Sequence, residues 1–185
     1  MSRIFTTLSL LAVTFLIVTL AMGLSIGDLY GESGSDAHGA AHKLKGLHFL
    51  FGLACSLVVL LVNSVSVTYF IGTSRWTKEV TAAYSLEDQY VRRCTGLKRR
   101  CFPLAVTGML TMLGIVALGA AADPGTLRSG TAWWATPHLV GALIGTSYIA
   151  LSFALQRNLI LQNYGVIAEV MQQVEAKRQG PQQEP

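Results

Sequence analysis

Hydrophobic residues are gathered in four long stretches from which charged residues are excluded. No Asp, Glu, Lys or Arg occurs in residues 4–27, 46–74, 101–122 or 129–156. Each stretch reaches the roughly 20 residues that cross a hydrocarbon core of about 30 Å. A core helix of a soluble protein would keep one strongly polar face toward water. The pattern predicts an all-α polytopic membrane protein, an up-and-down bundle with spans at about 4–26, 46–72, 102–122 and 134–156.

The segment between the second and third spans, residues 73–101, is rich in helix-forming residues and predicts further helical structure. Ser85, followed three residues later by Asp88, is typical of a helix start. The basic run that ends in Arg100 favours the negative C-terminal end of that helix. A new span would then begin with Pro103 in its first turn, where proline costs no hydrogen bond.

Turn signals bound the last two spans. Asp123-Pro124-Gly125 predicts a sharp end to the third span. Thr136-Pro137 predicts a cap and a first-turn proline for the fourth. Residues 157–178 continue as a helix, and its apolar stripe needs a partner, either segment 73–101 or another chain. The stripe consists of Ile160, Ile167, Met171 and Val174. Residues 179–185 are polar and predict a disordered tail.

The distribution of charged residues predicts how the helices are oriented in the membrane and does not indicate a binding partner. The formal net charge is +4, and eleven of the fourteen Lys and Arg residues lie before span one, between spans two and three, or after span four. The positive-inside rule puts these segments and both termini in the cytoplasm, in a bacterial inner membrane. Without interleaved aromatics or a recognition fold, the basic residues do not indicate nucleic acid. An N-terminal signal peptide, with Ala21 or Gly23 near its cleavage site, is the rival interpretation, and its removal would leave three spans.

All four histidines fall on the outer side of this topology. His48 opens span two and His138 opens span four, and both spans run from outside to inside. Each histidine heads a stripe of small or polar residues at helical spacing, which lets a backbone or a flat cofactor approach closely. The stripes comprise Gly52, Cys55, Val59, Asn63 and Ser66 in span two, and Gly141, Gly145, Tyr148 and Ser152 in span four.

These stripes raise the hypothesis of a haem b held between spans two and four, with His48 and His138 as axial ligands. Tyr148 and Asn63 would then serve a nearby quinone site. If Ile71 and Leu161 mark the cytoplasmic edge, both histidines lie 23 residues from it and their levels match. If Arg75 and Arg157 mark it, the levels differ by about 12 Å, which forbids a shared haem without helix tilt.

A weaker metal hypothesis involves Asp36, His38 and His42. The histidines are four residues apart, so they share one helix face and can chelate zinc or copper, but no third ligand is fixed by the spacing. Catalysis finds no support in the pattern, because the spans carry no paired carboxylates and the chain has no phosphate loop or nucleophile motif.

The sequence therefore favours a non-catalytic subunit or scaffold of a membrane complex. Such a protein would lie in the lipid bilayer and bind a membrane-protein partner, or a second copy of itself, through its small-residue faces and its C-terminal helix. The alternative is a haem-b electron-transfer subunit with its bis-histidine site on the outer side.

Overall fold

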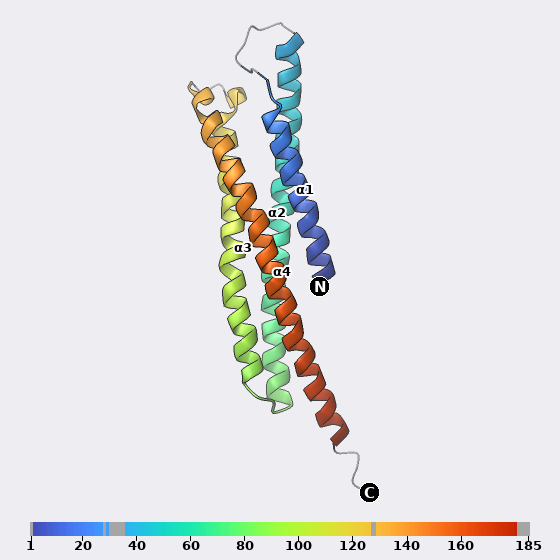
Figure 1. The fold of residues 1–185 in the computed structure, drawn as a ribbon. Helices are drawn as coiled ribbons and strands as arrows, with labels where there is room; N and C mark the ends of the chain where they lie inside the picture. Colours follow the sequence, from blue (N-terminus) through green and yellow to red (C-terminus); the bar gives the residue numbers. More distant parts are fainter. Residues whose placement is uncertain (1, 28, 30–35, 127–128, 181–185) are drawn as a thin grey trace.

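The computed structural model describes residues 2–27, 29, 36–126 and 129–180, and within them it is all-helical. Four long helices carry the fold: α1 (Ser2–Leu24), α2 (Asp36–Ala83), α3 (Gln89–Ala122) and α4 (Ala135–Gln179). Two short 3-10 helices, η1 (Pro124–Thr126) and η2 (Thr131–Trp134), lie between α3 and α4. The helices run up and down in chain order, which confirms the predicted four-helix bundle (Figure 1).

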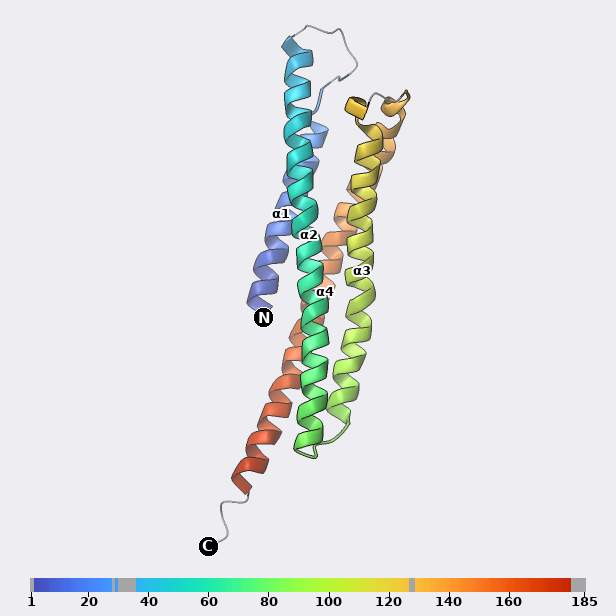
Figure 2. The same cartoon turned by 180° about the vertical axis from the view of Figure 1, so that it is seen from behind.

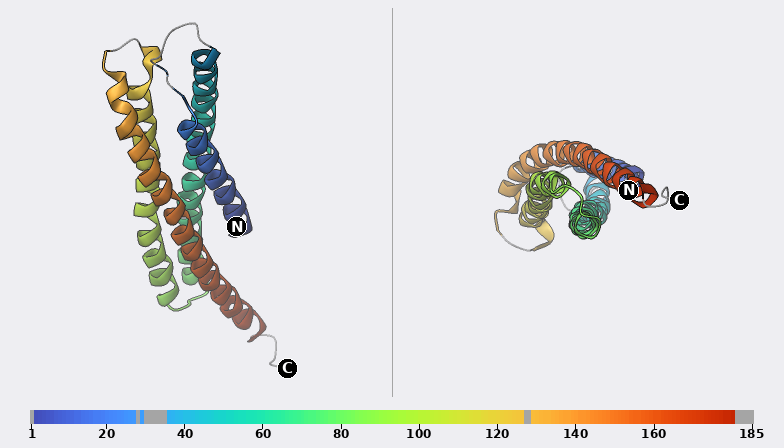
Figure 3. Two further views of the ribbon diagram at one scale, coloured as in Figure 1. Left: turned by 45° about the horizontal axis from the view of Figure 1, so that its top comes forward. Right: turned by 90° about the horizontal axis from the view of Figure 1, so that it is seen from below.

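The two ends of the bundle differ in what they carry. The α2–α3 turn, the start of α1 and the end of α4 point toward one end (Figures 1 and 2), which we call the arginine end after the basic residues of α3. The end of α1, the start of α2 and the two short helices η1 and η2 lie toward the opposite end, which we call the histidine end. Helix α4 crosses the bundle obliquely, so that it meets α3 at the histidine end and continues past α1 (Figure 3).

All four helices are long and apolar enough to cross a membrane. Their most apolar 18-residue windows have mean hydropathies of 1.6 to 2.3, yet only 22–33% of each window is buried inside the protein. Large side chains such as Phe49, Leu57 and Leu110 are more than half exposed. Surfaces this apolar need hydrocarbon as their solvent, so the chain is an integral membrane protein.

The predicted segment 73–101 is not an element of its own. Helix α2 runs unbroken for 48 residues, or about 72 Å at helical rise, and α3 begins at Gln89. The predicted helix start at Ser85 is wrong: this residue lies in the turn with φ 48°. The predicted helix end at Arg100 is also wrong, since α3 continues through Pro103 to Ala122. Packing against α2 and α4 offsets the one backbone hydrogen bond that Pro103 removes.

The other turn signals hold closely. Helix α3 ends at Ala122 with Asp123 as its C-cap, and η1 follows. Pro137 lies in the first turn of α4, as predicted, but Thr136 is not the cap because α4 begins at Ala135 after η2. Of the predicted tail, residues 181–185 lie outside the described residues.

The apolar stripe of the C-terminal helix has its partner within the chain. Of its predicted residues, Ile160 and Val174 are buried in the same core as residues of α2 and α3, whereas Met171 is 44% exposed. Val166 and Val170 complete the buried face in place of Ile167 and Met171. Lys177 Nζ donates to the carbonyl oxygens of Tyr84 and Ser85 in the α2–α3 turn at 2.8 and 2.9 Å. Of the two partners that the sequence left open, segment 73–101 is the one that the fold supplies.

Candidate functional site

Two histidines meet between the helix pairs near the histidine end. The α1–α2 and α3–α4 pairs separate toward this end (Figures 1 and 3). His48 of α2 and His138 of α4 come together across that separation, with ring centroids 6.2 Å apart and ring planes at 77°. The two imidazoles are therefore at one level, which corresponds to the matched case of the two membrane edges considered from the sequence.

His48 is seated against α1. Its Nδ1 lies 3.0 Å from the backbone oxygen of Thr19. A carbonyl oxygen only accepts, so Nδ1 carries the ring proton and Nε2 keeps its lone pair. A Cβ built on Gly23 would lie 3.0 Å from the His48 Cε1, closer than most real Cβ contacts. Gly23 thus provides the space in which the imidazole lies.

His138 is seated against α3 in the same way. A Cβ on Gly119 would lie 3.0 Å from the His138 Cε1. The buried Nδ1 of His138 faces the backbone of Ile115 without completing a hydrogen bond. Ile115 precedes Gly119 by four residues, as Thr19 precedes Gly23. Each helix pair therefore presents one imidazole, with a glycine beneath the ring and a carbonyl one turn away.

The ring separation suits a metal between the two histidines. With a metal–nitrogen bond of about 2.0 Å and roughly 1.1 Å from nitrogen to ring centre, two axial imidazoles lie about 6 Å apart. Metal-binding histidines commonly use their other nitrogen to donate to a backbone carbonyl, which fixes the tautomer and orients the ring. His48 meets both conditions, and His138 meets the first and faces a carbonyl for the second.

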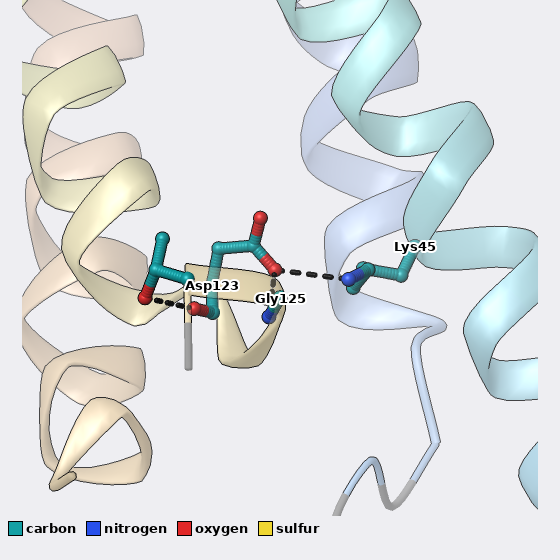
Figure 4. A network of polar contacts seen from close by, with 4 residues as sticks. Lys45, Asp123 and Gly125 are labelled. Carbon is teal, nitrogen blue, oxygen red and sulfur yellow. Dashed lines mark hydrogen bonds and ion pairs between the residues drawn. The ribbon is translucent and has the colours of Figure 1, made fainter. Parts of the chain in front are cut away.

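An ion pair crosses between the helix pairs at the same end. Lys45 Nζ, one turn before His48, lies 2.9 Å from the Oδ1 of Asp123 at the end of α3 (Figure 4). The same oxygen accepts from the backbone N–H of Gly125 at 2.9 Å. The hydrogen bond from Lys45 holds the pKa of Asp123 below its usual value. A cation is thus fixed beside the histidine pair.

The glycines that the sequence singled out pack within each helix pair rather than between the rings. A Cβ on Gly52 would meet Thr19 of α1 at 3.9 Å. Cβ atoms on Gly141 and Gly145 would approach the Cδ1 atoms of Leu118 and Ile115 of α3 to 2.7 and 2.6 Å, so these side chains would have to shift. These glycines let α3 and α4 lie close together, and close packing fixes the height of His138.

Asn63 and Tyr148, the predicted quinone residues, lie on different sides of α3. Asn63 is fully buried, and its Oδ1 lies 3.1 Å from where a Cβ on Gly108 would be. The Tyr148 hydroxyl bonds Thr107 instead, and the ring lines an apolar groove between α3 and α4. The structure does not bring these two residues together into one site.

A buried amide network that the sequence analysis missed involves Gln156. Its Nε2 donates to Asn63 Oδ1 and to Ser152 Oγ, both at 3.0 Å, and Ser152 donates to the Leu104 carbonyl at 3.1 Å. The signal was present in the sequence: Gln156 follows Ser152 by four residues and extends the stripe that begins at His138. This network ties α2, α3 and α4 together below the histidines.

The metal hypothesis at the start of α2 is supported by a close contact between its two histidines. The rings of His38 and His42 have centroids 4.5 Å apart. Asp36 is exposed at the first turn, and the described residues contain no group of three His, Cys, Asp or Glu side chains placed to hold a metal ion.

Comparisons with known proteins do not assign a function to the chain. No protein-family model, no curated protein and no solved structure matches the chain. The function of the protein therefore has to be inferred from its own residues.

Proposed function

We propose that this protein is a membrane cytochrome of the b type, an electron carrier with one haem held by His48 and His138. The observation that carries the proposal is the 6.2 Å separation of two imidazoles that come from different helix pairs. The separation matches that of two axial ligands on one iron, and the two histidines are 90 residues apart in sequence.

The surroundings of the two rings support the same function. Thr19 fixes the tautomer of His48 so that Nε2 is available for the iron, and Gly23 and Gly119 leave room for both rings. The α1–α2 and α3–α4 helix pairs diverge toward the histidine end (Figure 1), and each pair supplies one of the two imidazoles. Bound haem would supply reversible one-electron transfer, and the apolar bundle would keep water from the iron.

Lys45 has a part in this proposal. Haem b carries two carboxylates, and a cation near the membrane surface is the usual way to balance them. Lys45 stands one turn from His48 toward the histidine end and already holds a carboxylate, that of Asp123. We propose that Lys45 binds a haem carboxylate, either with Asp123 or in its place.

The proposed orientation follows from charge. Arg92, Arg93 and Lys98 to Arg100 lie toward the arginine end, and the positive-inside rule puts this end in the cytoplasm. The haem would then lie toward the outer face of a bacterial inner membrane, and both termini would be cytoplasmic. Electrons would enter or leave on the side opposite the basic surface.

Absorption spectroscopy tests the proposal directly. The protein is expressed with a haem precursor in the medium, purified in detergent and reduced with dithionite. We expect Soret and α bands of a low-spin bis-histidine haem in the wild type, and their loss in His48→Ala and in His138→Ala. His42→Ala is the matched control, since His42 is exposed at the same end and should keep full haem content.

Two results would contradict the proposal. A colourless wild-type protein that takes up no added haemin would exclude haem, and so would bands that persist in both single variants. The scaffold function favoured by the sequence would then be the better proposal. The fold gives it less support, because the buried face of the C-terminal helix and the glycine faces pack within the chain and not against a partner.

A further inference from the structure

A groove lined by arginines lies between α3 and α4 at the arginine end, far from the histidines. It encloses about 470 Å³ and its lining combines cationic walls with an apolar floor. The residues that line it are Arg92, Arg93, Gly96, Leu97, Arg100, Gln162 and Val166. The proposed function uses none of them.

The charge in this groove is only partly balanced by the protein. Arg93 forms a two-point ion pair with Glu169 of α4, and this contact lowers the pKa of the Glu169 carboxyl. Arg92 and Arg100 form no ion pair with any residue that the structure describes. The groove therefore presents two uncommitted guanidinium groups, and guanidinium binds phosphate oxygens in a two-point geometry.

The position of the groove suits a phosphate at a membrane surface. Arg100 directly precedes the charge-free stretch 101–122, so its guanidinium stands where the hydrocarbon core gives way to the headgroup layer. Arg92 lies about 12 Å farther along α3, in the aqueous layer. A phosphate held between these two side chains would be at the depth of a phospholipid headgroup.

A second, apolar groove lies on the same side of the α3–α4 pair. It encloses about 340 Å³, and its lining includes Gly114, Ile144 and Gly145. Gly96 and Gly114 are 18 residues apart on α3, as are Ile144 and Gln162 on α4. Eighteen residues are five helical turns, so the two grooves face the same way, about 27 Å apart along the helices. An acyl chain that starts at the first groove would run toward the second.

We propose that the α3–α4 face binds one anionic phospholipid, with its phosphate between Arg92 and Arg100 and an acyl chain along the pair toward Gly114. The charge selects an anionic headgroup, and the apolar groove distinguishes a lipid from a free phosphate. The phosphate groove shares no residue with the seats of His48 and His138, so lipid binding through Arg92 and Arg100 and haem binding can each fail alone.

Native mass spectrometry of the delipidated protein in detergent measures the binding. The probes are phosphatidylglycerol, phosphatidylcholine of the same acyl chains, and inorganic phosphate. We expect one tightly bound phosphatidylglycerol, weaker phosphatidylcholine and no retained phosphate. Arg92→Gln with Arg100→Gln should weaken phosphatidylglycerol about 25-fold, at roughly fivefold for each surface arginine.

A matched variant makes the result decisive. Lys78→Gln with Lys98→Gln removes the same charge outside the groove and should leave phosphatidylglycerol binding unchanged.

Three outcomes would overturn the proposal. Equal loss in the two charge variants would reduce the effect to overall positive charge. Retention of inorganic phosphate with the same dependence on Arg92 and Arg100 would make the groove a site for free phosphate. Equal binding of both lipids by the wild type would remove any selection by the arginines. Circular dichroism of each variant checks that the helices are intact.

Discussion

The two ends of the bundle use opposite ways of holding helices together. At the arginine end, α2, α3 and α4 share a continuous core and several polar contacts between helices. Asn163 donates to Tyr69 and Thr73 at 3.2 and 3.0 Å, and Thr77 contacts Cys94 at 3.5 Å. At the histidine end, the helix pairs separate, and the described side-chain contacts between them are the histidine pair and the Lys45–Asp123 ion pair.

This difference separates stability from function. Buried polar bonds fix one register, because a slip of one helix would leave a buried amide or hydroxyl without a partner. The arginine end and the Gln156 network can therefore determine the fold. The histidine end does not have to fix the helix register. Its imidazole pair, positioned by glycines and one backbone oxygen, is suited to bind a ligand instead.

The largest expected effect comes from the glycines beneath the imidazoles. Gly23→Val and Gly119→Val place methyl groups where the His48 and His138 rings now lie. We expect each variant to lose more than nine-tenths of its bound haem, measured as the reduced α band per protein, because the rings must turn away. Gly46→Val, on α2 where a Cβ meets nothing within 4 Å, should keep the haem. Full haem content in both Gly23→Val and Gly119→Val would show that these glycines do not make room for haem-binding histidines.

The Gln156 network should give the next largest effect, on stability rather than on haem. Gln156→Leu removes two hydrogen bonds and leaves Asn63 Oδ1 without its donor. We expect the free energy of unfolding to fall by about 1–2 kcal/mol. The measurement is the loss of helix content in mixed micelles as the SDS fraction increases. Ser147→Ala, which removes an exposed bond to the Leu143 carbonyl of its own helix, should change stability little. An unchanged Gln156→Leu midpoint would contradict a structural role.

The smallest expected effect concerns the ion pair at the histidine end. Because Lys45 lowers the pKa of Asp123 in the folded state, the pair stabilises the fold at neutral pH. This contribution is complete above the ordinary Asp pKa of 3.8 and is lost as the pH falls through the lowered value. For a partly exposed pair we expect roughly 0.2–1 kcal/mol.

The measurement compares the SDS midpoints of wild type and Asp123→Asn between about pH 6 and pH 3. Their difference should shrink toward the acid end. Asp88→Asn, at the arginine end, serves as the control for general acid effects. A difference that grows on acidification would show that the sign of the argument is wrong.

The fold was more predictable than the site. The absence of charge over four stretches is a sum over many residues, so the number and approximate limits of the apolar helices follow from the sequence. The continuity of α3 through Pro103 did not follow, because tertiary packing outweighs the hydrogen bond that proline removes. The histidine pair was predicted as two residues, while Gly23, Gly119 and Thr19 were not, since each lies on a different helix from the ring it positions.

The sequence by itself determined the solvent of each segment, since partition into hydrocarbon depends on the composition of a segment and not on its neighbours. Only the tertiary structure decided which side chains meet. Helix tilt, close approach at Gly141 and Gly145, and the unbroken length of α2 and α4 set the height of each residue along the bundle. A shift of one helical turn, about 5.4 Å, would separate His48 from His138, and no local pattern in the chain records that register.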